Sequence, residues 1–345
     1  MKRKHETGSL DDLESFVGED DSKYFAEILG RKINTMNQRY MLPADADEIK
    51  RSALHHRVVN WIFAGKNYIG PVKEVLSLNR GRRKSRVLDL GTGGGNWAID
   101  IADEFPAVDV VGVDLAPIQP RDVPVNCCFE LCDLDQYELP YPDEYFDVMH
   151  ARSMHHGIKN YPRFLQEVAR ILRPGGLLVI IEYDTEPLIN GDFAGDIVRA
   201  GNDTKMPAWV ALWRSFRECL CRKGIDLATP RRLRKLLQGT GAFRKIVTQQ
   251  SDVPIGFWPQ DDTQLTIGQL AWMEHDLLLP VNRQNVTGQA AELSPSAFEH
   301  DIGIDYDAEI NHILKHSQAT ESYAEDDTGL SEADLEAFIK DFLTR

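Results

Sequence analysis

The spacing of apolar residues predicts a helix after Pro43. This proline would end any helix before it, and Asp45 or Asp47 can cap a new N-terminus. Apolar residues then recur every three or four positions, which is typical of one helix face. They are Ile49, Ala53, Leu54, Val58 and Ile62. We therefore expect a helical lead-in before the rest of the chain.

From Arg86 onward, short apolar runs alternate with amphipathic stretches. The runs VLDL, VDVVGVDL, CCFELCDL, FDVMHA and LLVIIEY are separated by helical patterns such as NWAIDIADEF and YPRFLQEVARIL. Runs that are apolar on both faces indicate a parallel sheet covered by helices on each side, with right-handed crossovers. The stretch LRPGGLLVII predicts a helix end, a turn with positive φ at Gly175 or Gly176, and a fully buried strand. The fold class is α/β, Rossmann-like, with a mostly parallel sheet.

Helical patterns dominate after Glu186. PAWVALWRSFRECLCRKG comes first, followed by TPRRLRKLLQGTG with Thr229 as cap and Pro230 as first helical residue. A strand is predicted at FRKIVTQQ, and helices at IGQLAWMEHDLLL and LSEADLEAFIKDFL. The expected divisions are a mobile segment (1–36), a helical cap (37–80), the sheet core (81–186), a helical insertion with a return strand (187–258) and a mainly helical acidic region (259–345).

Composition narrows the classes of function. A net charge of -15 argues against a general nucleic-acid binder, because neutralising phosphates needs excess Lys and Arg. No apolar stretch reaches membrane-span length and the first residues lack a signal peptide, so we expect no membrane association and a cytoplasmic protein. The run Lys2–Lys4 leaves nuclear import as an alternative. Five cysteines without CxxC or matching His spacing predict neither a disulfide frame nor a metal site.

Charge is unevenly distributed. Bases dominate between Trp213 and Lys245, and acids dominate between Phe298 and Arg345. Each run can be a solvated helix face, or a docking surface for an anionic substrate or a protein partner.

The stretch VLDLGTGGGNW places a glycine-rich turn between a strand and a helix, where backbone amides face a ligand. A dinucleotide fingerprint would need a third glycine where Asn96 stands, which disfavours an oxidoreductase. The spacing is D-x-G-x-G-x-G, and its acid, Asp89, would repel a pyrophosphate and attract a cation. S-adenosylmethionine carries an ammonium, a sulfonium and no phosphate. We therefore expect it as the cofactor.

Further acids fit the same ligand. Asp114 ends the next strand, 25 residues after Asp89, where a carboxylate can bind ribose hydroxyls. Asp133 follows the third strand and can accept from the adenine amino group, with Leu134 packing on the ring or offering its backbone amide. Each acid alone could instead be a helix cap or a loop residue.

The motifs VLDLGTGGG, GVDLAP, CDLD, FDVMHARSMHHG and LRPGGLLV resemble the class I S-adenosylmethionine-dependent methyltransferases. YMLPADADEIKRSALHH, GVDLAPIQP and VPVNCCFE resemble the fungal LaeA-like methyltransferases of secondary metabolism. The resemblance covers about 38–185, and VPIGFWP more loosely. The sequence departs from the pattern at QYELPY, which stands in place of an aromatic WxF segment, and in lacking a seventh strand.

The resemblance implies a set of cofactor contacts. Tyr40 matches a residue that closes over the cofactor, and Arg152 lies where the fourth strand delivers a side chain toward the methionine end. The remaining matching positions are Gly91, Thr92, Gly93, Asp114, Leu115, Asp133 and Leu134.

Methyl transfer needs a positioned acceptor and, where the acceptor carries a proton, a base. His155 or His156, just after the fourth strand, can serve as that base, or both can be structural. Glu182 and Tyr183 end the fifth strand and can orient an amine or hydroxyl, or be structural. The aromatics Trp209, Trp213 and Phe216 have helical spacing and fit a core better than a substrate cage.

Two functions of different class follow. One is an enzyme that methylates oxygen or nitrogen of a small molecule or peptide from fungal secondary metabolism. The other is a regulatory protein, in the nucleus or cytosol, that keeps the cofactor fold and acts through protein partners. A closed apolar cavity beside the methyl position favours the first, and an open cleft bordered by charge favours the second.

Overall fold

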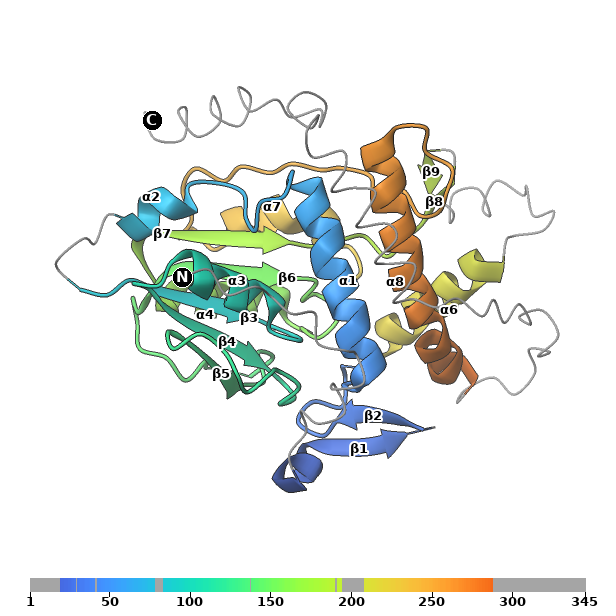
Figure 1. Ribbon diagram of the computed structural model, residues 1–345, viewed down its shortest axis with the longest axis horizontal. Coiled ribbons are helices and arrows are strands. Elements are labelled where there is room, and N and C mark those ends of the chain that lie inside the picture. Colours follow the sequence, from blue (N-terminus) through green and yellow to red (C-terminus); the bar gives the residue numbers. More distant parts are fainter. Residues whose placement is uncertain are drawn as a thin grey trace.

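The computed structural model describes residues 19–28, 30–40, 42–77, 83–136, 138–189, 191–193 and 208–287. Its main sheet has five parallel strands in the order β5-β4-β3-β6-β7 (Figure 1). The strands are β3 (Arg86–Leu90), β4 (Asp109–Asp114), β5 (Cys127–Leu131), β6 (Phe146–Arg152) and β7 (Leu172–Ile181). This order reverses between β3 and β6, so the carboxyl ends of these two strands flank the position where α/β sheets bind ligands.

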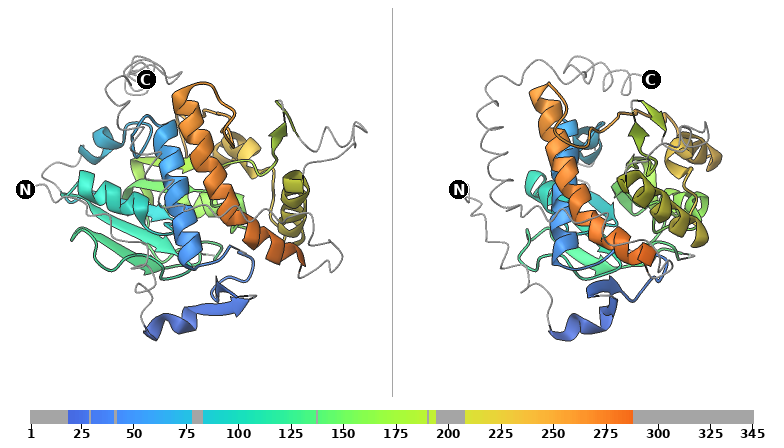
Figure 2. Two further views of the ribbon diagram at one scale, coloured as in Figure 1. Left: turned by 45° about the vertical axis from the view of Figure 1, so that its right-hand side comes forward. Right: turned by 90° about the vertical axis from the view of Figure 1, so that its right-hand side faces the viewer.

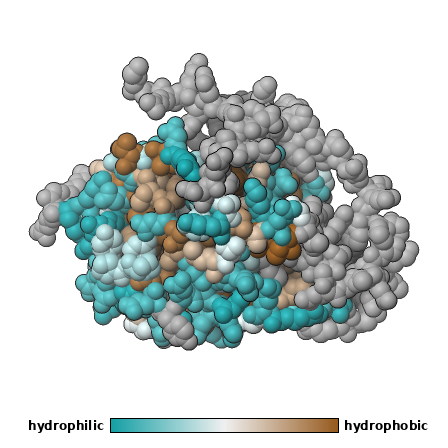
Figure 3. Space-filling view, turned by 90° about the horizontal axis from the view of Figure 1, so that it is seen from below, coloured by the Kyte–Doolittle hydropathy of each residue, from teal (hydrophilic) through white to brown (hydrophobic). Residues whose placement is uncertain are grey.

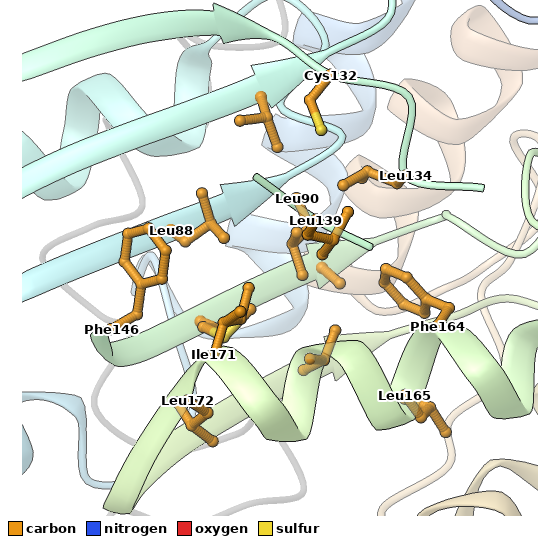
Figure 4. Close-up of a cluster of buried hydrophobic side chains, with 14 of the residues drawn as sticks. Leu88, Leu90, Cys132, Leu134, Leu139, Phe146, Phe164, Leu165, Ile171 and Leu172 are labelled. Carbon is orange, nitrogen blue, oxygen red and sulfur yellow. The ribbon is translucent and has the colours of Figure 1, made fainter. Parts of the chain in front are cut away.

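Helices cover both faces of the sheet, as the apolar runs predict. Along β3, Val87 packs on one face with α2 (Val72–Ser77) and α3 (Asn96–Glu104). The next residue, Leu88, packs on the other face with α4 (Tyr161–Ile171), whose Phe164 and Leu165 are shown in Figure 4. Because successive side chains point to opposite faces, each strand has to be apolar throughout.

Two long helices lie side by side beyond the carboxyl ends of the strands in Figures 1 and 2. They are α1 (Ala46–Ile62) and α8 (Asp262–Thr287), joined by a buried apolar cluster that contains Leu54, Val58, Leu270 and Ala271. The expected cap of α1 is confirmed, because the Asp45 side chain accepts from the Glu48 amide. The helix α6 (Ala208–Arg222) packs against α8.

The expectation of a mobile segment over residues 1–36 is wrong for its last part. A 3-10 helix at Glu19–Tyr24 leads into an antiparallel hairpin of β1 (Phe25–Ile28) and β2 (Arg31–Asn34). Arg31 is buried and pairs with Asp45 at 2.5 Å, so this ion pair fixes the hairpin to the N-terminus of α1. The spacing of apolar residues along the sequence could not predict this contact between two charged side chains.

Three local expectations differ from the structure. FRKIVTQQ is not a strand, and Val247 within it is exposed, because these residues pair with no strand of the described sheet. For the same reason β7 is an edge strand and only half-buried, although Gly175 has the expected positive φ of 79°. The helix α7 (Thr229–Gly239) has Ala228 at its N-cap instead of the predicted Thr229. The Asp226 side chain accepts a hydrogen bond from the Ala228 amide, so the turn that leads into the helix begins earlier.

The remaining elements complete the described chain. A short hairpin of β8 (Leu188–Ile189) and β9 (Asp192–Phe193) follows β7. Trp213 and Phe216 of α6 are buried with Leu42 and Leu220, which confirms them as core, whereas the Trp209 side chain lies outside what is described. The run Lys2–Lys4, the predicted helix LSEADLEAFIKDFL and the acidic stretch Phe298–Arg345 also lie outside the described residues.

The described surface is mainly hydrophilic at the margins of the view in Figure 3, with hydrophobic residues gathered toward its middle. Phe257 and Trp258 are exposed, at 56% and 68% of their surface. Within the described ranges, no helix is long and apolar enough to cross a membrane.

Candidate functional site

Asp89 lies beneath the glycine-rich turn between β3 and α3. One of its carboxylate oxygens accepts from the Thr92 hydroxyl at 2.6 Å, and the other contacts Nδ1 of His150 at 2.7 Å. The His150 ring stacks on Trp97 of α3 with centroids 3.9 Å apart. Both oxygens of Asp89 are therefore engaged within the protein, where they hold the glycine-rich turn in shape.

The glycines of the turn are fixed by their backbone conformation and by their neighbours. Gly91 has φ of 67°, and a Cβ there would lie 2.0 Å from Sδ of Met154. Gly93 also has positive φ, and a Cβ on it would approach the Ser52 hydroxyl of α1 to 3.0 Å. The backbone of the glycine-rich turn thus packs against the loop after β6 at Gly91 and against the helix α1 at Gly93.

Asp114 ends β4 and faces the turn. Its carboxylate accepts from the backbone amides of Gly93 at 2.8 Å and Leu115 at 2.7 Å. Burial raises the pKa of Asp114 to about 6, although the backbone amides oppose this by stabilising the charge. The group is a carboxylate at pH 7 whose surroundings are poor in water, which suits a hydrogen bond to a ligand hydroxyl.

A small pocket opens beside Asp114 and Gly93. Across from them lie the segment that follows β2 and the first turns of α1, which contribute Tyr40, Glu48 and Ser52. Among the described residues, the lining of this pocket includes the carboxylates of Glu48 and Asp114 and no Lys or Arg. Such a lining disfavours a phosphate and fits a cationic nucleoside. These residues therefore fit S-adenosylmethionine, with Tyr40 on the opposite wall from the turn.

Asp133 and Leu134 follow β5 and are held by the protein itself. One oxygen of Asp133 accepts from the buried Asn37 side chain at 3.0 Å and from the Asp135 amide at 3.0 Å. The Leu134 side chain belongs to the main core, where Figure 4 places it near Leu139. The core buries this side chain, so packing on an adenine would require it to leave its neighbours. Its backbone amide is the alternative that remains.

Arg152 ends β6 and is directed at α1. Its guanidinium contacts Nδ1 of His56 at 3.3 Å, and the other ring nitrogen of His56 lies 2.8 Å from Asp100 of α3. Burial lowers the pKa of Arg152, with Asp89 among the acids that oppose the shift. Arg152 thus joins α1 to the strand end next to the turn.

Glu182, after β7, is a hub for the loop that follows β6. Its oxygens accept from the backbone amides of Met154 and His155, from the Tyr161 hydroxyl, and from Nδ1 of His155 at 2.8 Å. The side chains of Glu182 and His155 are 1% and 0% exposed. This arrangement matches the structural alternative for both residues, since neither side chain reaches open space.

His156 and Tyr183 pack on each other beside this hub. Their rings meet edge to face with centroids 5.5 Å apart, and His156 also contacts Phe216 of α6. Burial lowers the pKa of His156 well below its ordinary value, with no acid opposing the shift, and raises that of Tyr183. Both side chains are therefore neutral at pH 7.

A polar cluster that the sequence analysis did not identify lies between α1, α8 and the end of β6. Nδ1 of His55 is 3.2 Å from Glu274 of α8, and Nε2 of His55 is 3.1 Å from the Ser153 hydroxyl. Arg51 bridges Glu274 and Glu48 at 2.7 Å each. The adjacent histidines of ALHH offer a weak sequence signal, while Glu274 looks like one polar position in an amphipathic helix.

Comparisons with known proteins identify the family of the chain. A family model described as a methyltransferase domain matches residues 64–243. The secondary metabolism regulator LAE1 of Cochliobolus heterostrophus is 31% identical over 66% of this chain and 70% of its own length. The secondary metabolism regulator laeA of Coprinopsis cinerea is 33% identical over 63% of this chain. A protein-methionine methyltransferase laeA of Emericella nidulans is 28% identical over 76% of this chain and 69% of its own length.

The matches differ in extent. This chain spans about half, 53%, of the Coprinopsis cinerea relative. The family model takes in the sheet, the glycine-rich turn, Asp114 and the loop after β6, but neither α1 nor α8. The chain therefore belongs to the S-adenosylmethionine-dependent methyltransferase domain family and is a distant homologue of the LaeA-like proteins.

Proposed function

We propose that the protein transfers a methyl group from S-adenosylmethionine to oxygen or nitrogen of a small molecule or peptide of fungal secondary metabolism. The observation that carries this proposal is the pocket at Asp114, whose lining, in the part of the chain that the structure describes, has carboxylates and no basic side chain. Its position at the carboxyl ends of parallel strands, in a methyltransferase domain, supports the cofactor assignment.

Residues around the turn would hold the cofactor. Asp114 accepts from the ribose hydroxyls, and the backbone of Gly91 and Gly93 gives close approach. Tyr40 covers the pocket from the side of the hairpin. Asp133 or the Leu134 amide serves the adenine, and Arg152, with the charge of Asp89 behind it, lies at the methionine end.

When bound, S-adenosylmethionine would supply a methyl carbon that its sulfonium makes electrophilic. The chain has to hold the acceptor in line, exclude water and remove a proton from a protic acceptor. The side chains that gather beyond β6 and β7 come from α1, α6 and α8, and most are buried. This enclosure supports a small acceptor or a single inserted side chain.

A regulatory role through protein partners is the second candidate, because two of the relatives are named secondary metabolism regulators. A docking surface would then accompany the pocket, and the basic stretch Trp213–Lys245 supplies candidates. In the described part of that stretch several arginines are already paired. Arg217 and Arg231, for example, both meet Asp184 and Glu186. This pairing favours the enzymatic role.

Two measurements test the proposal. Calorimetric titration with S-adenosylmethionine should give saturable binding, and NAD should give none. Incubation of the full chain with methyl-labelled cofactor and fungal extract should place the label in small molecules or peptides. Binding of NAD in preference to S-adenosylmethionine would exclude the proposal, and label in larger proteins alone would favour the regulatory candidate.

A further inference from the structure

Three residues from distant parts of the chain form a continuous polar chain at the ends of β6 and β7. Glu274 on α8 meets Nδ1 of His55 on α1, and Nε2 of His55 meets the hydroxyl of Ser153. The sequence separations are 219 and 98 residues, so tertiary packing alone brings the groups together. The apolar seam between α1 and α8, with Leu54 and Leu270 at its centre, sets their spacing.

Ser153 is held in an unusual backbone conformation. Its φ is 58°, which lies in the left-handed region that residues other than Gly, Asn and Asp rarely adopt. Its amide donates to the carbonyl of Ile181 at 2.9 Å, which fixes the turn after β6 to the end of β7. Strain of this kind costs on the order of 1–3 kcal/mol and is concentrated at functional sites.

Ser153 also adjoins the cofactor turn. The next residue, Met154, lies so near Gly91 that a Cβ there would be 2.0 Å from its Sδ. The preceding residue, Arg152, is joined to His56. The hydroxyl is thus carried by the segment between the glycine-rich turn and α1, and it is only partly buried.

The charge around His55 favours a neutral ring with a free lone pair toward Ser153. Burial lowers its pKa, Arg152 and Arg51 lower it further, and together they outweigh the opposing effect of Glu274. Burial would raise the pKa of Glu274, but His55 and Arg51 bring it down to about 2. Tyr183 is a further titratable neighbour of His55, with ring centroids 6.0 Å apart, and burial keeps it protonated. An anionic Glu274 accepts from Nδ1–H, which leaves Nε2 to accept from Ser153.

We infer that Ser153, His55 and Glu274 form a proton relay for the methyl acceptor, and that the acceptor is a hydroxyl or amine that carries a proton. This inference rests on the proposed function. When the acceptor's bond to carbon forms, its proton passes to Oγ of Ser153, and the Ser153 hydroxyl proton passes to Nε2 of His55. The imidazolium that results is stabilised by Glu274. Ser153 touches the acceptor, and Glu274 is a positioning residue.

The relay combines a residue of the shared domain with residues outside it. Ser153 lies within the stretch that the family model matches, 64–243, whereas His55 and Glu274 lie on either side of it. A thioether acceptor has no proton to lose and would leave the relay without a role. The relative from Emericella nidulans is named a protein-methionine methyltransferase, so the relay separates this chain's acceptor class from that one.

The first test requires no acceptor. In the full chain labelled with 15N-histidine, NMR should show His55 neutral at pH 7, protonated at Nδ1, with a pKa below 6.5. Glu274→Gln should lower that pKa further, because it removes the charge that stabilises the imidazolium. Gln264→Ala, at an exposed position of α8 and outside the relay, should leave it unchanged. A charged His55 at pH 7, or a ring protonated at Nε2 alone, would overturn the relay.

The second test measures the reactivity of Ser153. Methanesulfonyl fluoride should sulfonylate its hydroxyl, with fluoride leaving and the proton passing to His55, and mass spectrometry locates the label. The rate should fall at least about tenfold in His55→Gln and should fall in the wild type as pH drops through the His55 pKa. Ser52, which faces Gly93, is the internal control and should stay unlabelled. Equal labelling of both serines, or an unchanged rate in His55→Gln, would refute the inference.

Cofactor titration on the same variants separates the two hypotheses. His55→Gln and Glu274→Gln should bind S-adenosylmethionine as the wild type does, while methyl incorporation from fungal extract falls at least about tenfold. Methyl incorporation at the wild-type level by His55→Gln would refute the relay and would still be consistent with the proposed function. If the wild type itself did not bind S-adenosylmethionine, the proposed function would be refuted.

Discussion

The carboxylate of Asp114 accepts a hydrogen bond from the backbone amide of Gly93 at 2.8 Å, across the gap between β4 and the turn after β3. The same carboxylate accepts from Leu115 with its other oxygen. One side chain thereby sets the distance between the two cofactor motifs, and it has lone pairs left for a ligand. Its substitution should affect binding more than folding.

Replacement of Asp114 by Ala should weaken S-adenosylmethionine binding by at least about tenfold, because a charged hydrogen-bond acceptor for the ribose is lost. Calorimetry measures the change in Kd. Asp114→Asn, which keeps the shape, should weaken binding less than Ala does. Unchanged affinity in both variants would show that Asp114 does not contact the ribose.

Cofactor affinity should depend on pH through the same group. Burial raises the pKa of Asp114 to about 6, so the carboxylate that accepts from the ribose is present above this pH and is lost below it. Affinity should be constant from pH 7 to 8 and about tenfold weaker at pH 5. Titrations of the Asp114→Asn variant should not show this step. A step of equal size in the variant would assign it to another group.

Gly91→Ala should abolish cofactor binding and lower stability by at least about 1–3 kcal/mol. The backbone φ of 67° strains any residue with a Cβ, and the flexible end of Met154 would also have to move away from a new Cβ that lies 2.0 Å from its Sδ. Denaturant unfolding and calorimetry measure the two effects. Gly239→Ala, at the end of α7 with open space around it, is the matched control and should be neutral or stabilising. Similar losses in both variants would contradict the packing argument.

Glu182→Ala should lower stability by roughly 3–5 kcal/mol, since it leaves His155 Nδ1 and two backbone amides without their buried acceptor. Tyr161→Phe removes one donor to the same carboxylate and should cost only about 1 kcal/mol. Chemical denaturation distinguishes these values. A small effect of Glu182→Ala with loss of methyl transfer would instead indicate that Glu182 contacts the acceptor.

Sequence patterns were sufficient for the sheet because burial on both faces demands continuous apolar runs. The Asp45 cap and the turn at Gly175 follow from short-range hydrogen bonding and φ, which local sequence also encodes. The patterns did not predict that FRKIVTQQ lacks a strand partner, since pairing depends on the edge that β7 presents. They also missed the hairpin at residues 25–34, whose anchor is the pair of Arg31 and Asp45.

The candidate site divides along the same line. The amino-acid sequence by itself determined the glycine turn, Asp89, Asp114 and the cofactor class, because those residues lie at fixed offsets from strands that hydrophobicity reveals. Tertiary structure decided which side chains are already engaged, turning Glu182 and His155 inward and joining His55 to Ser153 and Glu274. Polar contacts between distant residues depend on how α1 and α8 pack, and no periodic signal along the chain records that packing.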